Sequence, residues 1–198
     1  MILKLSDETL EEALHLTVSV LMKGGIVAYP TETFYALGVR FDDEVALIRL
    51  YEIKRRPKDK TMPLIIGEEK QLNDIAKEVN ASAQRLMQRF WPGPLTLVFN
   101  AVAGLSEFIT ADGKVAARVP GRSFALALAQ RAGFPITATS ANTSGKPPAD
   151  CVEMVGNYFP ECIDLIIDAG DTRGGLPSTI VDVTGDAIKV LREGAVAM

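Results

Sequence analysis

The sequence has few of the residues from which many catalytic sites are built. Its single histidine, His15, lies inside an amphipathic helical pattern next to an apolar position, so we assign it to the surface of a helix. Ser-His-Asp and Cys-His chemistry and zinc hydrolysis of the HExxH type are therefore not expected. The two cysteines, Cys151 and Cys162, are too sparse for a disulfide framework or a zinc site, and we interpret both as buried or incidental thiols.

Long apolar runs and a targeting segment are missing as well. Stretches such as IVAYP, ITATSA and DLIIDAG are far shorter than the roughly 20 residues that span a bilayer. The N-terminus lacks the basic region and apolar core of a signal peptide. Because no linker, repeat or low-complexity tract divides the chain, we expect one soluble, cytoplasmic domain over residues 1–198.

Familiar nucleotide-binding motifs are absent too. GxGxxG does not occur in the sequence. The only SGK, at residues 144–146, has Ser140 where a Walker motif needs glycine and Pro147 where it needs a hydroxyl. A nucleotide would therefore be held in some other way.

What the sequence does contain is a short basic segment in an acidic chain. The net charge is −4, yet KRRPKDK at residues 54–60 combines five basic residues with one aspartate. A focused cationic site on an acidic protein fits a compact polyanion such as a nucleoside triphosphate. A solvated charged loop is the alternative interpretation.

Alternating helical and strand-like patterns predict an α/β protein. Helical spacing begins after the polar start SDET and recurs along the chain, over residues 10–21, 42–55, 81–90 and 124–133 and near 154–159. Strand-like runs lie at residues 26–30, 35–41, 62–67, 95–101, 115–120, 136–140, 164–170, 178–184 and 188–193. This mixture predicts an open, twisted mixed sheet with helices packed on it.

Hydroxyl, amide and cationic side chains stand where these predicted elements begin or end. The set comprises Thr31, Thr33, Lys54, Arg56, Arg118, Thr139, Ser140, Asn142, Ser178, Thr179 and Arg192. Open α/β sheets bind ligands beyond the carboxyl ends of their strands, and such donors suit phosphate and carboxylate oxygens. A site without a nucleophile or an imidazole base would act by positioning and electrostatics. For YPTETFYALG a structural reading stays open, in which Pro30 ends the strand, Thr31 caps a turn and Tyr35 fills the core.

Over almost its whole length the sequence resembles the YrdC/Sua5 family, the threonylcarbamoyl-AMP synthases. Eight motifs carry the resemblance, in family order: GGIVAYPTETFYALG, IKRRP, PLII, WPGPLTLV, VAARVP, TSANTSGKPP, PSTIVDV and LREG. The resemblance implies an open α/β fold of the YrdC type around a deep, basic concave active-site surface. It also implies a nucleotidyltransferase that converts L-threonine, bicarbonate and ATP, used with Mg²⁺, to threonylcarbamoyl-AMP and pyrophosphate.

The resemblance further implies partners for the product. The threonylcarbamoyl group would pass to a tRNA threonylcarbamoyl-transfer complex, which places it on adenosine 37 (t6A) of tRNAs that read codons beginning with A. A weak contact with tRNA or RNA would be compatible with this handover. No membrane and no metal held by protein ligands is expected.

Carried over residue by residue, the family motifs imply roles for particular side chains. Catalysis and triphosphate binding fall to Lys54 and Arg56, threonine binding to Thr31, Thr33, Tyr35, Arg118 and Ser178, and further nucleotide contacts to Lys60, Thr110, Ser140, Asn142 and Arg192. In particular, the Arg118 guanidinium would clamp the threonine carboxylate in two-pronged fashion.

Two other functions stay open from the sequence. A module for binding double-stranded RNA or tRNA, or for ribosome assembly, would accept duplex RNA by shape on a concave basic surface. A carbamoyl-transfer domain of the kind used in hydrogenase maturation is the second, although such a domain normally sits inside a much larger chain. The sequence ends four residues after LREG, at Met198, which resembles the short single-domain form of the family.

Overall fold

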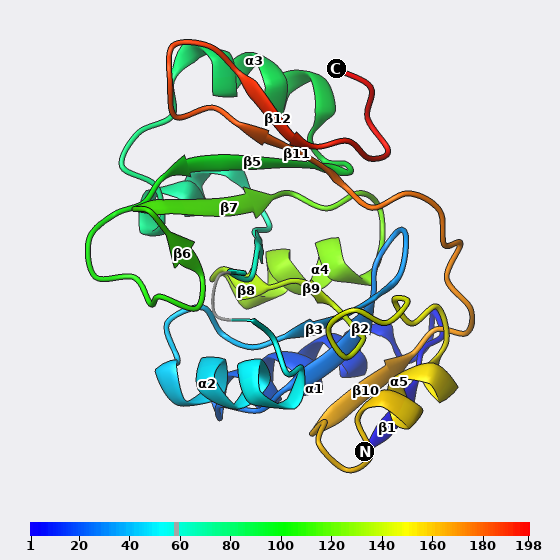
Figure 1. Cartoon of the computed structure of the whole chain (residues 1–198). Helices are drawn as coiled ribbons and strands as arrows, with labels where there is room; N and C mark the ends of the chain where they lie inside the picture. Colours follow the sequence, from blue (N-terminus) through cyan, green and yellow to red (C-terminus); the bar gives the residue numbers. More distant parts are fainter. Residues whose placement is uncertain (58–59) are drawn as a thin grey trace.

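The computed structural model describes residues 1–57 and 60–198, whose strands form two hydrogen-bonded sheets with helices packed around them (Figure 1). The first sheet has the spatial order β1 (Ile2–Lys4), β10 (Leu165–Asp168), β2 (Val27–Pro30), β3 (Tyr35–Gly38) and β9 (Thr139–Ser140). The second has the order β12 (Lys189–Arg192), β11 (Thr179–Asp182), β5 (Leu95–Asn100), β7 (Lys114–Arg118), β4 (Leu64–Ile65) and β8 (Ile136–Thr137), with β6 (Thr110–Ala111) paired to β7. Both sheets mix parallel and antiparallel pairs, as the sequence predicts.

The helices lie where the periodic patterns predict them. They are α1 (Leu10–Met22), α2 (Glu44–Ile53), α3 (Ala81–Phe90), α4 (Phe124–Ala132) and α5 (Val152–Tyr158), with a 3-10 helix at Glu69–Asp74. Asp43 and Asn80 cap the starts of α2 and α3 by accepting backbone hydrogen bonds from Ala46 and Ala83. Within the described residues, no helix combines the length and the apolar character that crossing a membrane requires.

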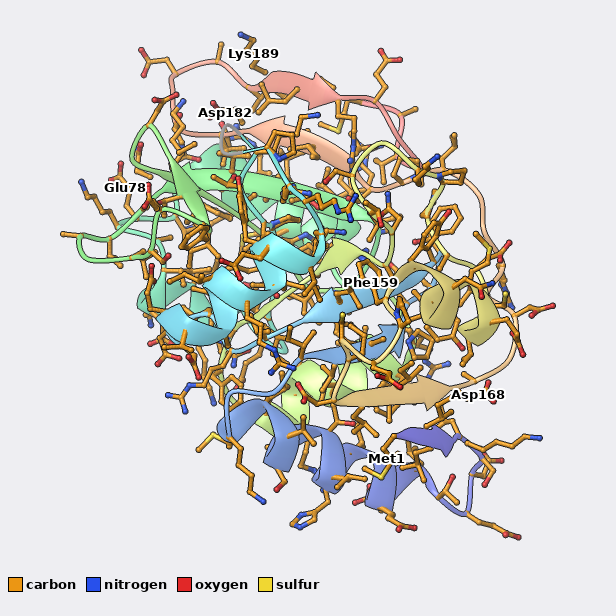
Figure 2. The ribbon with its side chains drawn as sticks, turned by 60° about the horizontal axis from the view of Figure 1, so that its bottom comes forward. Met1, Glu78, Phe159, Asp168, Asp182 and Lys189 are labelled. Carbon is orange, nitrogen blue, oxygen red and sulfur yellow. The ribbon has the colours of Figure 1, made fainter. Side chains whose placement is uncertain are left out.

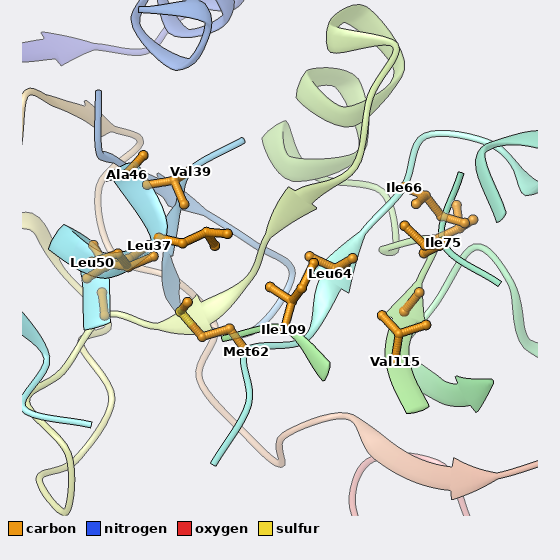
Figure 3. Packing of buried hydrophobic residues seen from close by; sticks show 14 of the residues in the cluster. Leu37, Val39, Ala46, Leu50, Met62, Leu64, Ile66, Ile75, Ile109 and Val115 are labelled. Atoms are coloured by element: carbon orange, nitrogen blue, oxygen red, sulfur yellow. The ribbon is translucent and has the colours of Figure 1, made fainter. Parts of the chain in front are cut away.

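Two clusters of buried side chains hold the layers together. The larger cluster joins side chains from both sheets with α2, and Figure 3 shows Leu37 and Leu50 on one side of it and Leu64 and Val115 on the other. The smaller cluster packs α1 and α4 against β2 and β10. Burial of this apolar surface is the main favourable contribution to folding and fixes the two sheets relative to each other.

The strand predicted at residues 136–140 is divided between the two sheets. Ile136 and Thr137 pair with β4 in the second sheet, whereas Thr139 pairs with β3 in the first. Where the sequence predicts one sheet, the structure therefore has two, and the chain passes from one to the other at residues 136–140. Strands that switch between packed sheets form such corners. The α/β class with mixed sheets is confirmed.

A long irregular segment, which we call the strap (residues 169–178), connects the two sheets on one side of the molecule (Figure 1). It leaves the end of β10 and reaches the start of β11. Backbone hydrogen bonds fix it on the way, from Thr172 N to Asp150 O at 2.8 Å and from Gly174 N to Thr33 O at 2.9 Å. Figure 2 shows Met1 near the first sheet and Lys189 at the opposite end of the molecule.

Candidate active site

A cavity of about 880 Å³ opens between the two sheets and the strap, and this volume is typical of a site for a small molecule or cofactor. Most of the predicted site residues line it: Thr31, Thr33, Tyr35, Arg56, Arg118, Ser140, Asn142, Ser178 and Arg192. Three predicted residues, Lys54, Lys60 and Thr110, are not part of its wall. The fold therefore gathers side chains as far apart in the sequence as Thr31 and Arg192 into one concave surface.

The wall of the cavity is positively charged. Among the residues that the structure describes, five cationic side chains and two carboxylates line it: Arg56, Lys114, Arg118, Lys146 and Arg192, with Asp112 and Asp182. A cleft with this charge balance attracts anions even though the whole chain is acidic. The basic concave surface implied by the family resemblance is thus present in the fold.

The turn at residues 31–34 forms one side of the cavity. The Thr31 hydroxyl donates to Phe34 O at 2.7 Å and accepts from the backbone amides of Thr33 and Phe34. Thr31 Oγ1 also lies 3.2 Å from Thr33 Oγ1, a contact in which either hydroxyl can be the donor. Thr31 shapes the turn, as the structural reading of the sequence expects, while Thr33 keeps free acceptor capacity at the cavity wall.

Tyr35 supplies a rigid aromatic wall. The side chain is buried, and its hydroxyl donates to Gly170 O at 2.8 Å and accepts from Ala169 N at 3.1 Å. Burial raises the pKa of Tyr35 to about 12, so the phenol stays neutral at physiological pH. Both partners of the hydroxyl belong to the strap, and Tyr35 thereby holds the start of the strap against the turn.

Lys54 does not line the cavity, although the sequence predicts that it binds the triphosphate. Its side chain is 1% exposed, and Nζ donates to Ser140 O at 2.5 Å and Asn142 O at 2.7 Å. These carbonyls belong to the SAN loop (residues 140–148), whose Ser140 and Asn142 side chains line the cavity. We correct the prediction accordingly: the ammonium is held inside the protein by two carbonyls, so Lys54 supports the loop from behind instead of facing the cavity.

Lys54 also predicts a pH dependence of stability. Burial, with a smaller contribution from the charge of Arg56, lowers the pKa of Lys54 from its ordinary value of 10.5 to about 7. Between these values the unfolded chain binds more protons than the folded chain, so the free energy of unfolding increases as the pH rises through this range. Urea unfolding at about pH 7 and about pH 9 should show this increase in the wild type and a smaller one in Lys54→Met. An equal increase in both proteins would mean that Lys54 titrates normally.

Among the described residues of the basic segment, Arg56 is the cation that lines the cavity. Its guanidinium donates to Lys60 O at 2.8 Å, Thr61 O at 2.7 Å and Thr139 Oγ1 at 3.3 Å. These contacts order the side chain at the cavity wall. Lys60 contributes its backbone carbonyl, which accepts the hydrogen bond from Arg56. The Lys60 side chain is exposed and does not line the cavity. The predicted nucleotide contact of Lys60 is therefore corrected to a backbone contact with Arg56.

Thr110 does not line the cavity either. Its hydroxyl donates to Ser106 O at 2.8 Å, within the loop that leads into β6. The neighbouring Ala111 and Asp112 line the cavity instead. The hydrogen bond to Ser106 holds the Thr110 hydroxyl within its own loop, whereas the turn that follows β6 brings Asp112 to the cavity wall.

Arg118 and Glu32 form a largely buried ion pair beside the turn at residues 31–34. Arg118 Nη1 donates to Glu32 Oε1, and the exposed fractions of the two side chains are 11% and 17%. Sequence analysis predicts Arg118 but not Glu32, although the acid stands between two predicted threonines. The sequence signal for it is an acidic residue between two threonines, in a chain where an arginine, Arg118, ends another predicted strand.

Ser178 and Arg192 form the opposite wall. Arg192 Nη2 donates to Ser178 O at 2.7 Å and to Ser178 Oγ at 3.1 Å, and Ser178 Oγ lies 2.9 Å from Thr96 Oγ1. Burial, and after it the charge of Arg118, lowers the pKa of Arg192. The charge of Arg118 thus acts on Arg192, and both side chains line the cavity, where two positive charges favour the binding of an anion.

A further pair on the wall was not predicted from the sequence. Lys114 Nζ donates to Asp182 Oδ2 at 2.7 Å. Burial alone would raise the pKa of Asp182, but hydrogen bonds from Lys114 and Thr184 outweigh it and lower the pKa. Among the residues that the structure describes, no group of three histidine, cysteine, aspartate or glutamate side chains is placed to hold a metal ion.

Comparisons with known proteins agree on one family. The model of the Sua5/YciO/YrdC family, described as telomere recombination, matches residues 19–194. A threonylcarbamoyl-AMP synthase from Pyrococcus abyssi is 39% identical over 193 residues, which are 96% of this chain and 57% of that protein. A threonylcarbamoyl-AMP synthase from Escherichia coli is 36% identical over 184 residues, which are 90% of this chain and 95% of that protein.

The fold is also that of a solved relative. The crystal structure of P. abyssi Sua5 complexed with L-threonine matches with a TM-score of 0.92 and 37% sequence identity, covering 98% of this chain and 57% of that one. The chain thus spans little more than half the length of the Pyrococcus relative and nearly the full length of the E. coli relative. On the matched residues and the shared fold, this chain belongs to the Sua5/YciO/YrdC family.

Proposed function

We propose that this chain is an L-threonylcarbamoyladenylate synthase, which converts L-threonine, bicarbonate and ATP to threonylcarbamoyl-AMP and pyrophosphate. The observation that carries the proposal is one cavity whose wall combines five cations with a cluster of hydroxyls. The relatives named threonylcarbamoyl-AMP synthase, at 39% and 36% identity, support it.

The proposed chemistry needs no covalent enzyme intermediate. The threonine amine takes up carbon dioxide, or takes up bicarbonate with loss of water, and becomes a carbamate. A carbamate oxygen then forms a bond to the α-phosphorus of ATP while the bond from that phosphorus to the pyrophosphate oxygen breaks. Mg²⁺ enters with ATP as part of the substrate. The protein acts by aligning the two substrates and by balancing the negative charge on the departing pyrophosphate.

We assign the two halves of the cavity to the two substrates. Arg56, with Ser140 and Asn142 of the SAN loop, faces the triphosphate, since a guanidinium and polar side chains suit phosphate oxygens. Arg118 receives the threonine carboxylate, and Thr33 and Ser178 offer hydroxyls to the threonine side chain. Lys54 contributes through the position of the SAN loop.

The first test is the substrate requirement. Pyrophosphate release from ATP should need threonine, bicarbonate and Mg²⁺ together, because the α-phosphorus has no nucleophile until the carbamate forms. The assay measures pyrophosphate with each component omitted in turn. Equal release without threonine would point to a different enzyme.

The same assay separates the two alternatives. Addition of carbamoyl phosphate in place of threonine and bicarbonate would release pyrophosphate if the chain were a carbamoyl-transfer domain. An RNA-binding module would release none under any of these conditions and would instead bind duplex RNA with a strong dependence on salt. The threonine-dependent result is the one that we expect.

The remaining parts of the proposal concern context. As a single domain over residues 1–198, the enzyme would work in the cytoplasm, where tRNA is modified. Its product would pass to a tRNA threonylcarbamoyl-transfer complex for t6A formation. A weak tRNA contact on the positively charged rim would be compatible with that transfer.

A further inference from the structure

Glu32 occupies a special place behind the wall of the cavity. It belongs to the turn at residues 31–34, but its carboxylate contacts the Arg118 guanidinium, and only Arg118 of the two lines the cavity. Its aliphatic part lies over the backbone of Gly121, where an added Cβ would stand 3.5 Å from Glu32 Cγ. Glu32 thus lies between the turn that carries it and the backbone at Gly121.

The Arg118–Glu32 ion pair leaves part of its hydrogen-bonding capacity unused. Only one hydrogen bond joins the two side chains, from Arg118 Nη1 to Glu32 Oε1. The second oxygen, Oε2, is buried and has no hydrogen-bond partner among the described residues. A buried pair of charges repays its desolvation only when the remaining polar atoms are also satisfied. A pair that leaves a carboxylate oxygen unsatisfied is therefore more readily explained by function than by stability.

Because only Nη1 of Arg118 contacts Glu32, the other guanidinium nitrogens stay available for a ligand. The guanidinium has five N–H donors, and among the described residues its only hydrogen bond is the one to Glu32. The edge formed by Nε and Nη2 is left for a two-pronged contact with another carboxylate.

We infer that Glu32 is a positioning residue for Arg118: it holds the guanidinium by one nitrogen so that the other edge meets the carboxylate of the amino-acid substrate. The inference rests on the proposed function, because it names the group that orients the amino-acid end of the same site. Glu32 itself does not touch the substrate.

The main experiment replaces Glu32 by glutamine in the full chain. Glu32→Gln keeps the shape and an acceptor oxygen but removes the charge, so the strong charge-assisted bond becomes a weaker neutral one. The KM for threonine should rise about tenfold, while the KM for ATP should change less than about twofold. The matched control is Glu11→Gln, which breaks another Arg–Glu pair, with Arg131, on the surface away from the cavity. It should leave both KM values unchanged.

A double-mutant cycle asks whether Glu32 acts through Arg118. Arg118→Met alone should raise the KM for threonine, and adding Glu32→Gln to it should have no further effect on that KM. A purely structural role would add the same loss in both backgrounds, and a direct contact with threonine would do so as well. Either of those outcomes, or an unchanged KM for threonine in Glu32→Gln alone, would overturn the inference.

A second readout does not depend on activity. Phenylglyoxal modifies arginine side chains that are free to react, and mass spectrometry of peptides locates the modified residue. Glu32→Gln should increase the modification rate at Arg118 several-fold, whereas Glu11→Gln should leave that rate unchanged. If the wild type releases no threonine-dependent pyrophosphate, the proposed function fails while this result still supports the positioning role. An unchanged rate at Arg118 would contradict the positioning role even in an active enzyme.

Discussion

Valine should support pyrophosphate release with a kcat/KM about 10⁴-fold below that of threonine, whereas serine should fall only about 10 to 200-fold below it. Serine lacks a methyl group, and the loss of one methyl from an apolar pocket has a limited cost. Valine keeps the shape of threonine but lacks its hydroxyl, and a buried polar group built to meet that hydroxyl is then left unpaired.

We expect three side chains of the cavity wall to make this discrimination. The hydroxyls of Thr31 and Tyr35 have their protons engaged by Phe34 O and Gly170 O, so these residues act as walls for the methyl group. Thr33 Oγ1 lies 3.2 Å from Thr31 Oγ1 and has lone pairs that can accept a hydrogen bond from a substrate hydroxyl. Steady-state kinetics with the three amino acids, repeated on Thr33→Val, is the measurement. Thr33→Val should reduce the rejection of valine, and a wild type that prefers valine to serine would show that the cavity reads shape alone.

Substitution of Lys54 or Arg56 by alanine should lower pyrophosphate release at least about tenfold, since each loses charge-assisted contacts of roughly 1.5 to 3 kcal/mol. The two losses should differ in kind. Arg56→Ala should mainly raise the KM for ATP, because Arg56 lies on the cavity wall. It also removes the donors to Lys60 O and Thr61 O, so it should lower the melting temperature, but less than the loss of the buried Lys54 does. Lys54→Ala leaves the carbonyls of Ser140 and Asn142 without their buried donor, so it should lower both activity and the melting temperature.

Two lysines serve as controls for this comparison. Lys58 belongs to the same basic segment but lies outside the residues that the structure describes, and the family motif does not include it. Lys23 is exposed at the end of α1, away from the cavity. Their alanine variants should behave almost like the wild type. Comparable losses at Lys54, Arg56 and Lys58 would indicate a diffuse basic surface and would favour the RNA-binding alternative.

Much of the fold follows from local sequence signals. The start of α1 after SDET and the capping residues Asp43 and Asn80 are short-range features that a sequence displays directly. The division of residues 136–140 between two sheets is not such a feature. Ile136 pairs with β4 and Thr139 pairs with β3. The local pattern of apolar residues at 136–140 does not indicate which sheet each half joins.

The candidate site shows the same limit at the level of side chains. Residue types and motif positions predict that Arg118 and Ser140 belong to the site, and both line the cavity. They do not reveal that Lys54 points inward, because its direction depends on two carbonyls more than 80 positions away in the sequence. They also do not reveal Glu32, whose role depends on its contact with Arg118, 86 positions away. Motifs predict which residues gather, whereas the direction of each side chain depends on long-range packing.

The position of β10 in the first sheet has a consequence for the order in which the protein assembles during synthesis. β10 lies between β1 and β2, so Ile2 pairs with Ile166, and Val27 pairs with Leu165. Until the ribosome has released the chain through Asp168, β1 has no partner strand and the buried strand β2 keeps an open edge. Such an edge can pair with other chains. Nascent chains should therefore depend on chaperones or on fast elongation until β10 closes the sheet, and slow elongation before residue 168 should increase aggregation.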